Sequence, residues 1–153
     1  MHKRIALIIL ITSISLFSYC QKINKIDGFF VDEKGQKYSG DLISYYENGN
    51  KEFVYLINDG VEDGVVLFYY ENGNIMEEGF YKEGLKSGKW VKWGENGNKL
   101  AEANYDKGIK HGSWLVWDEK GVNRYEMEYN NGNRSGTWIS RNESGDVVSN
   151  KTY

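Results

Sequence analysis

The sequence predicts an all-β fold, an elongated meander of antiparallel β-hairpins stacked side by side in a single layer. Three observations predict it. Glycines recur at a constant spacing of 24 residues, short aromatic and β-branched segments lie between them, and the chain contains no proline. A fixed period of this length is typical of an array in which each unit buries its apolar surface against its neighbours.

Three series of glycines share this spacing, which excludes a chance arrangement. One series follows the first segment of each unit: Gly49, Gly73, Gly97, Gly121 and Gly145. A second series begins each unit: Gly40, Gly64, Gly88, Gly112 and Gly136. A third lies between units: Gly60, Gly84, Gly108 and Gly132. Two short segments separated by a glycine turn predict a β-hairpin, and the remaining glycines lead the chain to the next hairpin.

The first twenty residues lie outside the repeats and have the layout of an export signal. A basic start at 2–4 precedes the apolar run Ile5–Phe17. This run is shorter than the ~17–25 residues that a membrane-spanning helix needs. Three outcomes remain open: cleavage after Cys20, cleavage before Cys20 with lipid on its thiol as in bacterial lipoproteins, or an uncleaved anchor. We therefore expect an exported protein in the periplasm, in the outer membrane or at the cell surface.

The expected domain organisation has three parts. Residues 1–20 form the signal peptide or lipoprotein signal, residues 21–40 enter the array through a degenerate first hairpin, and residues 41–153 form the repeat array.

Cys20 is the only cysteine, so the array can form no internal disulfide. Loss of Lys3 and Arg4 with the signal moves the net charge from −3 to −5. This charge argues against nucleic acid and against an anionic membrane surface as partners.

The turns favour one particular geometry. Lys120 and Ser144 precede the turn glycine in the last two units, and neither tolerates a positive φ readily. A type I turn with a bulge, in which only the glycine is left-handed, suits all five turns.

A glutamate stands two residues before each turn glycine, and equivalent glutamates should lie roughly 10 Å apart. Because Ca²⁺ needs its oxygens at ~2.3–2.6 Å, we expect solvated turn residues, with no metal and no cofactor.

Aromatic residues recur in columns along the array. The second residue of each unit after its first glycine forms one column: Leu42, Val66, Trp90, Trp114 and Trp138. The fifth residue forms another: Tyr45, Tyr69, Trp93, Trp117 and Arg141. A third lies in the second segment: Ile57, Tyr81, Tyr105, Tyr129 and Tyr153. Alternate residues of a strand share a face, so the second and fifth residues should lie on opposite faces.

Two interpretations of these columns stay open. Stacked rings can form the core of an array that has no second sheet. Alternatively, one column lines a groove for a ligand, and the candidate binding residues are then Tyr45, Tyr69, Trp93 and Trp117. Small residues share the face expected for the tyrosines, where they would leave room for rings of neighbouring strands: Gly79, Ala101 and Ala103.

The residue inventory argues against an enzyme. His111 is the only histidine beyond the signal, and no thiol follows Cys20. A Ser–His–Asp triad would have to use His111, and a His/Cys zinc site lacks ligands. No phosphate-binding glycine motif is present. A carboxylate pair for glycoside cleavage stays open, but we expect a non-enzymatic protein with no catalytic residue.

The unit Gly88-Lys-Trp-Val-Lys-Trp93, with Glu95-Asn-Gly97, Tyr105 and the Gly108–Gly112 link, resembles a MORN repeat in its bacterial variant form. The resemblance covers about residues 28–153 in five units. Leu42 and Val66 replace the first tryptophan of the motif in two units. In the last unit, Arg141 replaces the aromatic residue at the fifth position. The resemblance implies an elongated curved sheet that scaffolds or binds proteins, with membrane association in eukaryotes.

The bacterial variants resemble YwqK-type antitoxins, which implies a toxin–immunity pair. Two functional hypotheses follow. The first is a binding module of the cell envelope with an unknown protein partner, a toxin or an envelope component, which would make the chain an antitoxin or immunity protein. The alternative is a structural or surface component, anchored by lipid on Cys20, that binds glycan or membrane. A membrane is expected as a partner only through that anchor.

Overall fold

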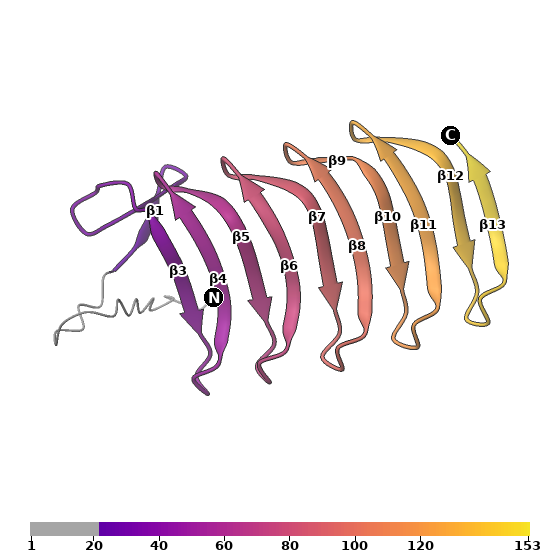
Figure 1. The fold of residues 1–153 in the computed structure, drawn as a ribbon, viewed down its shortest axis with the longest axis horizontal. Helices are drawn as coiled ribbons and strands as arrows, with labels where there is room; N and C mark the ends of the chain where they lie inside the picture. The colour runs from indigo at the N-terminus through magenta and orange to yellow at the C-terminus, as the bar shows by residue number, and fades with distance from the viewer. Residues whose placement is uncertain (1–21) are drawn as a thin grey trace, which may run out of the picture.

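A computed structural model describes residues 22–153. The export signal predicted for 1–20, including Cys20, therefore lies outside the described residues. The described chain is all-β, and its strands run one after another along a long, open sheet (Figure 1). This confirms the predicted meander. Among residues 22–153, no helix has the length and apolar character that crossing a membrane requires.

The main sheet has eleven strands that follow one another in chain order, each antiparallel to its neighbours. Its first half contains β3 (Gly40–Tyr45), β4 (Lys51–Asn58), β5 (Val61–Tyr69), β6 (Ile75–Lys82), β7 (Leu85–Trp93) and β8 (Lys99–Asp106). Its second half contains β9 (Ile109–Lys110), β10 (Gly112–Trp117), β11 (Asn123–Asn130), β12 (Asn133–Arg141) and β13 (Val147–Thr152). The short β9 pairs with β8 alone. A separate two-stranded sheet, β1 (Asn24–Ile26) with β2 (Phe29–Val31), precedes them.

The turns inside the hairpins have the predicted geometry. At Gly94–Gly97 the Gly97 N–H donates to the Gly94 carbonyl, and the Gly94 N–H donates to the Asn98 carbonyl, both at 2.9 Å. Gly97 has φ +80°, whereas Asn96 is not left-handed. The pairing register shifts beside the turn, between Lys92 and Trp93. The same pattern recurs at all five turns, which are therefore type I turns with a glycine bulge.

The connections between hairpins are also tight turns. Each is a two-residue loop in which both residues have positive φ, as a type I′ turn requires: Asp59-Gly60, Glu83-Gly84, Lys107-Gly108 and Asn131-Gly132. Successive turns interlock, since the Gly84 N–H donates to the Glu62 carbonyl at 2.8 Å. The aliphatic residue after one turn also lies over the glycine of the next. A Cβ on Gly108 would be 3.5 Å from Leu85 Cδ2.

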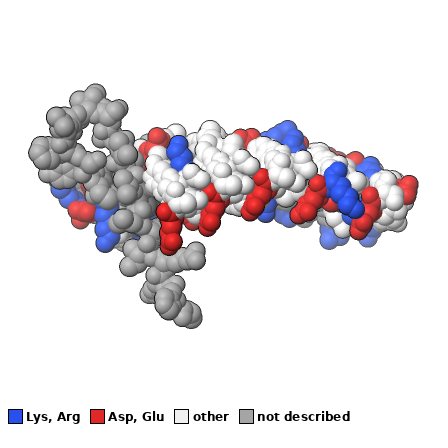
Figure 2. Space-filling model, turned by 90° about the horizontal axis from the view of Figure 1, so that it is seen from below, with Lys and Arg blue, Asp and Glu red and all other residues white. Residues whose placement is uncertain are grey.

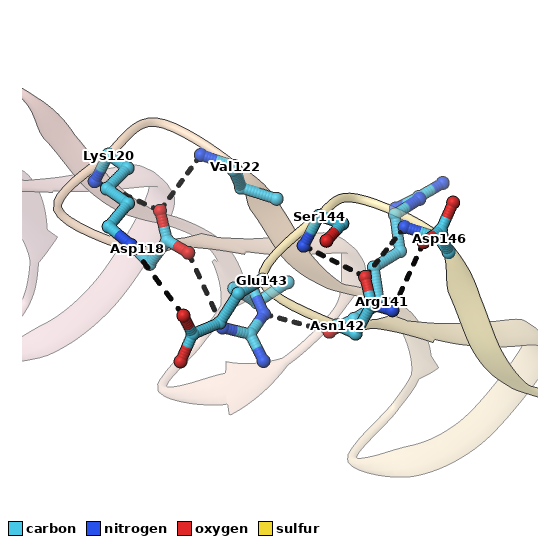
Figure 3. Close-up of polar contacts among 9 residues, drawn as sticks. Asp118, Lys120, Val122, Arg141, Asn142, Glu143, Ser144 and Asp146 are labelled. Carbon is cyan, nitrogen blue, oxygen red and sulfur yellow. Dashed lines mark hydrogen bonds and ion pairs between the residues drawn. The ribbon is translucent and has the colours of Figure 1, made fainter.

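The type I turns are joined by side chains instead. The Nδ2 of Asn50, of Asn74 and of Asn98 donates to a glutamate carbonyl of the following turn, at 2.8, 2.8 and 3.0 Å. We call these three residues the asparagine ladder. The last two turns, shown in Figure 3, have Val122 and Asp146 in place of the ladder asparagines, and there Asp118 and Asn142 accept backbone N–H groups of their own turns. There an ion pair from Lys120 to Glu143, at 3.6 Å, joins one turn to the next.

The core lies on one face of the sheet and changes character along the array. At the N-terminal end, Tyr38, Leu42 and Ile57 form a buried cluster, which Ile23 and Phe30 help to cover. Val66, in the next unit, is fully buried. Trp90 and then the rings of later units take over this position. Leu42 therefore replaces tryptophan where the N-terminal segment supplies additional covering side chains.

Candidate binding surface

One face of the sheet carries a continuous stack of rings, which we call the aromatic ladder. The tryptophans of the second-residue column and the tyrosines of the second segments alternate in it. Neighbouring ring centroids lie 5.1–6.2 Å apart, mostly edge to face, through Tyr81, Trp90, Tyr105, Trp114, Tyr129, Trp138 and Tyr153. Such geometries stabilise aromatic pairs beyond the area that they bury. Two columns that the sequence separates thus form one stack.

Cationic side chains cover this ladder in three successive units. The Lys86 ammonium lies 3.5 Å from the centroid of Trp90 and 5.2 Å from that of Tyr105. Lys110 and Arg134 repeat the contact over the next two Trp–Tyr pairs. Burial lowers the pKa of Lys86 despite the opposing charge of Glu77. From Trp90 onward, the rings of the ladder are therefore in contact both with neighbouring rings and with a cation of the protein itself.

The opposite face, which we call the open face, carries the third and fifth residues of each unit. Arg141 shows the placement of the fifth residue, because its guanidinium lies 2.7 Å from the carboxylate of Glu126, the cross-strand partner of Ile139. The four candidate residues Tyr45, Tyr69, Trp93 and Trp117 occupy the equivalent positions. Among the described residues none of these four rings stacks on another ring. Tyr45 is 37% exposed, and the other three are half-buried.

Lysine and turn residues surround the last of these rings. The Lys99 ammonium lies 5.7 Å from the centroid of Trp117. A shallow depression beside it is lined by Asn98, Lys99, Trp117, Lys120 and Gly121. Figure 2 shows acidic side chains recurring along the array on the edge that carries the type I turns. The structure thus places the four candidates in one row, near an acidic edge.

A second row on the open face alternates aliphatic and acidic residues across the strands. Glu78 pairs with Leu67 and Val91, and Glu102 pairs with Val91 and Leu115. The hydrogen bond from Lys99 is the largest cause that lowers the pKa of the Glu102 carboxyl; burial opposes it, and the charges of Lys99 and Lys89 add to it. This row of glutamates, spaced by 24 residues, was not among the sequence-predicted candidates.

Chemically, the open face offers rings, aliphatic side chains and carboxylates. Residues 22–153 contain no group of three or more His, Cys, Asp or Glu side chains arranged to hold a metal ion. His111 is exposed, and its backbone N–H donates to the Asn104 carbonyl at 3.0 Å. Rings, aliphatic side chains and carboxylates are groups that can recognise a partner through non-covalent contacts.

A single-layer array of hairpins, with one face packed by its own rings and one face open, defines a repeat protein of the binding or scaffold class. Residues 62–83 match the family model of the MORN repeat variant. That segment covers one hairpin, β5 and β6 with the turn between them. The MORN resemblance of the units is therefore supported for this repeat. No curated protein sequence matches the chain.

Proposed function

We propose that this protein is an exported, non-enzymatic binding module whose open face holds a protein partner. One observation carries the proposal. The rings of the aromatic ladder stack on one another beneath cations, whereas Tyr45, Tyr69, Trp93 and Trp117 stand in a row without ring partners. Partly exposed aromatic rings are enriched at the centres of protein interfaces.

The charge of the array favours a partner with basic groups. Glutamates recur on the open face and along the turn edge, and the net charge without residues 1–20 is −5. The finer proposal is that the partner is a secreted toxin or a component of the cell envelope. The export signal in the sequence and the resemblance to antitoxin-like MORN variants support an immunity role. Complementary charge would mainly accelerate association and suppress wrong partners.

A capture experiment tests the proposal. Purified protein is immobilised and exposed to an envelope extract, and bound proteins are quantified by mass spectrometry. We expect one protein to be retained by the wild type and lost by the double variant Trp93→Ala, Trp117→Ala. Tyr125→Ala is the matched control, because Tyr125 is exposed but lies on the ladder face. Equal capture by the double variant and the wild type would argue against the row, and recovery of no protein would argue against a protein partner.

The alternative function is separated by a second measurement. A lipid-anchored surface component requires that the mature chain begin at a lipidated Cys20, and it would bind glycan or membrane through the array. The mass of the mature N-terminal peptide decides between lipidated Cys20 and unmodified Gln21. Unmodified Gln21 would remove the lipid-anchor alternative.

A further inference from the structure

Three equivalent glutamates of the open face differ in the cations that they meet. Glu126 is paired with Arg141 at 2.7 Å. Glu102 is paired with Lys89 at 3.6 Å and also with Lys99. Glu78 occupies the same position one unit earlier, and no cation of residues 22–153 forms an ion pair with it. One carboxylate of the row is thus left without a partner from the chain itself.

The repeat explains why Glu78 lacks a cation. The residues 24 positions before Lys89 and Lys99 are Val65 and Ile75, so both lysines of the Glu102 unit are replaced by aliphatic residues. The fifth residue after Gly88, on the following strand β7, is Trp93, where the Glu126 unit has Arg141. Within the array, Lys89 is directed to Glu102 rather than to Glu78.

The half-buried Glu78 has apolar surroundings, and several of these apolar side chains are exposed. Val65 and Phe80, paired across β5 and β6, are 55% and 41% exposed. Leu56 and Ile75 are also exposed, whereas the cross-strand partners of Glu78 are the half-buried Leu67 and the buried Val91. Side chains that combine a hydrocarbon stem with a cationic head suit such a surface, because the stem covers apolar atoms while the head pairs with the carboxylate.

We propose that Glu78 and the apolar residues around it form the docking point for an arginine or lysine of the partner's contact segment, with apolar neighbours of that residue packing on Val65 and Phe80. The inference rests on the proposed function and states the chemistry of the partner. The next unit shows the arrangement with an internal cation. There Lys99 contacts the Glu102 carboxylate and lies 5.7 Å from the Trp117 ring. A partner's cation on Glu78 would have Trp93 in the place of Trp117.

The test uses a defined probe, a short fluorescein-labelled peptide in which arginine and leucine alternate. Its counterpart has citrulline, which is uncharged, in place of arginine. Fluorescence anisotropy measures binding of each peptide to the purified protein. We expect the arginine peptide to bind the wild type more tightly than the citrulline peptide, and Glu78→Gln to bind the arginine peptide about tenfold more weakly.

Two further variants make the test specific to this position. Glu102→Gln removes an equivalent carboxylate that the chain already pairs, and it should bind the arginine peptide as the wild type does. The double variant Val65→Lys, Ile75→Lys gives Glu78 the two lysines of the next unit, and it should bind as weakly as Glu78→Gln. Equal binding by the wild type and Glu78→Gln, equal weakening by Glu102→Gln, or no binding of the arginine peptide would overturn the inference.

The failure of this inference is distinguishable from failure of the proposed function. If Glu78→Gln captures the envelope partner as the wild type does while Trp93→Ala, Trp117→Ala does not, the row binds a partner but Glu78 is not its docking point. If the wild type, Glu78→Gln and the double tryptophan variant capture the partner equally, the open face is not the binding surface and both proposals are wrong.

Discussion

The indole of Trp90 on β7 lies directly against the backbone of Gly79 on β6. A Cβ added to Gly79 would stand 2.2 Å from the Cδ2 of the ring and 2.3 Å from its Cε2. Gly79 is not left-handed, so its backbone conformation alone does not require glycine. The ring requires it, since Trp90 is only 3% exposed and cannot move outward without exposing its core contacts. This confirms that Gly79 leaves room for a ring of a neighbouring strand.

Gly79→Ala should therefore destabilise the array, by about 1–3 kcal/mol as is usual for overpacking. Urea unfolding followed by tryptophan fluorescence measures the loss. The control adds Trp90→Val, because Val66 occupies the equivalent position of the preceding unit. On the Trp90→Val background, Gly79→Ala should cost much less, and an equal cost on both backgrounds would contradict the steric explanation.

The two tryptophan rows should differ in what they contribute to stability. Trp114 stacks on Tyr105 and Tyr129, and its indole N–H donates to the Asn104 carbonyl at 3.0 Å. Trp117 has no ring partner among the described residues. Trp114→Ala should cost roughly 3 kcal/mol, as for other truncations of packed aromatic residues, and Trp117→Ala clearly less. Thermal unfolding of the two variants provides the comparison, and equal losses would place Trp117 in the core.

The type I′ turns contain two residues that are poorly suited to their conformation. Glu83 and Lys107 have φ of +51° and +48°. Asparagine adopts this region more readily, so Glu83→Asn and Lys107→Asn should each raise the free energy of unfolding by about 0.5 kcal/mol. Chemical denaturation is the measurement. Glu95→Asn, at an exposed residue outside the left-handed region, is the control and should give no gain.

Alkaline pH should weaken the array through Tyr55. Burial, with smaller contributions from Tyr81, Glu62 and Glu77, raises the pKa of Tyr55 well above its usual range. The unfolded chain would lose this proton near pH ~10, so the stabilising contribution is complete below that pH and is lost as the pH rises toward the folded pKa. Tyr55→Phe should unfold like the wild type at neutral pH and resist alkaline conditions better.

Urea unfolding of both proteins at neutral pH and above pH ~10 checks this expectation. Since Lys86 and the other titrating groups are common to both, the difference between the proteins at each pH isolates the phenol. A difference that does not grow with pH would show that Tyr55 does not titrate differently in the folded and unfolded chains.

The main elements of the fold follow from local sequence, because each turn carries its own chemistry. Lys120 and Ser144 were enough to predict type I turns with a left-handed glycine, and the structure confirms that geometry. The type I′ turns were predicted only as glycine links. Two of them have Glu83 and Lys107 before the glycine, which are not typical residues of type I′ turns. The other two, Asp59-Gly60 and Asn131-Gly132, carry the usual signal for such turns.

The candidate surface was harder to predict, because it depends on register between strands. Trp90 and Tyr105 belong to separate columns in the sequence, and only the pairing of Gly88 with Tyr105 brings their rings together. Glu78 was missed for a different reason. Its repeat with Glu102 and Glu126 is visible in the sequence, but the loss of its cations appears only when the partners of all three are compared. Whether Trp93 and Trp117 bind a ligand stays a prediction.

The two kinds of turn give the array a direction across its width as well as along its length. One long edge carries the asparagine ladder and its glutamates, and the other stacks Leu85 and its equivalents on turn glycines. No rotation within the sheet exchanges these edges. A segment lying parallel to the strands would therefore meet carboxylates at one of its ends and aliphatic side chains at the other. An extended partner would then bind in a single orientation, and reversing the order of its residues would abolish the fit without changing its composition.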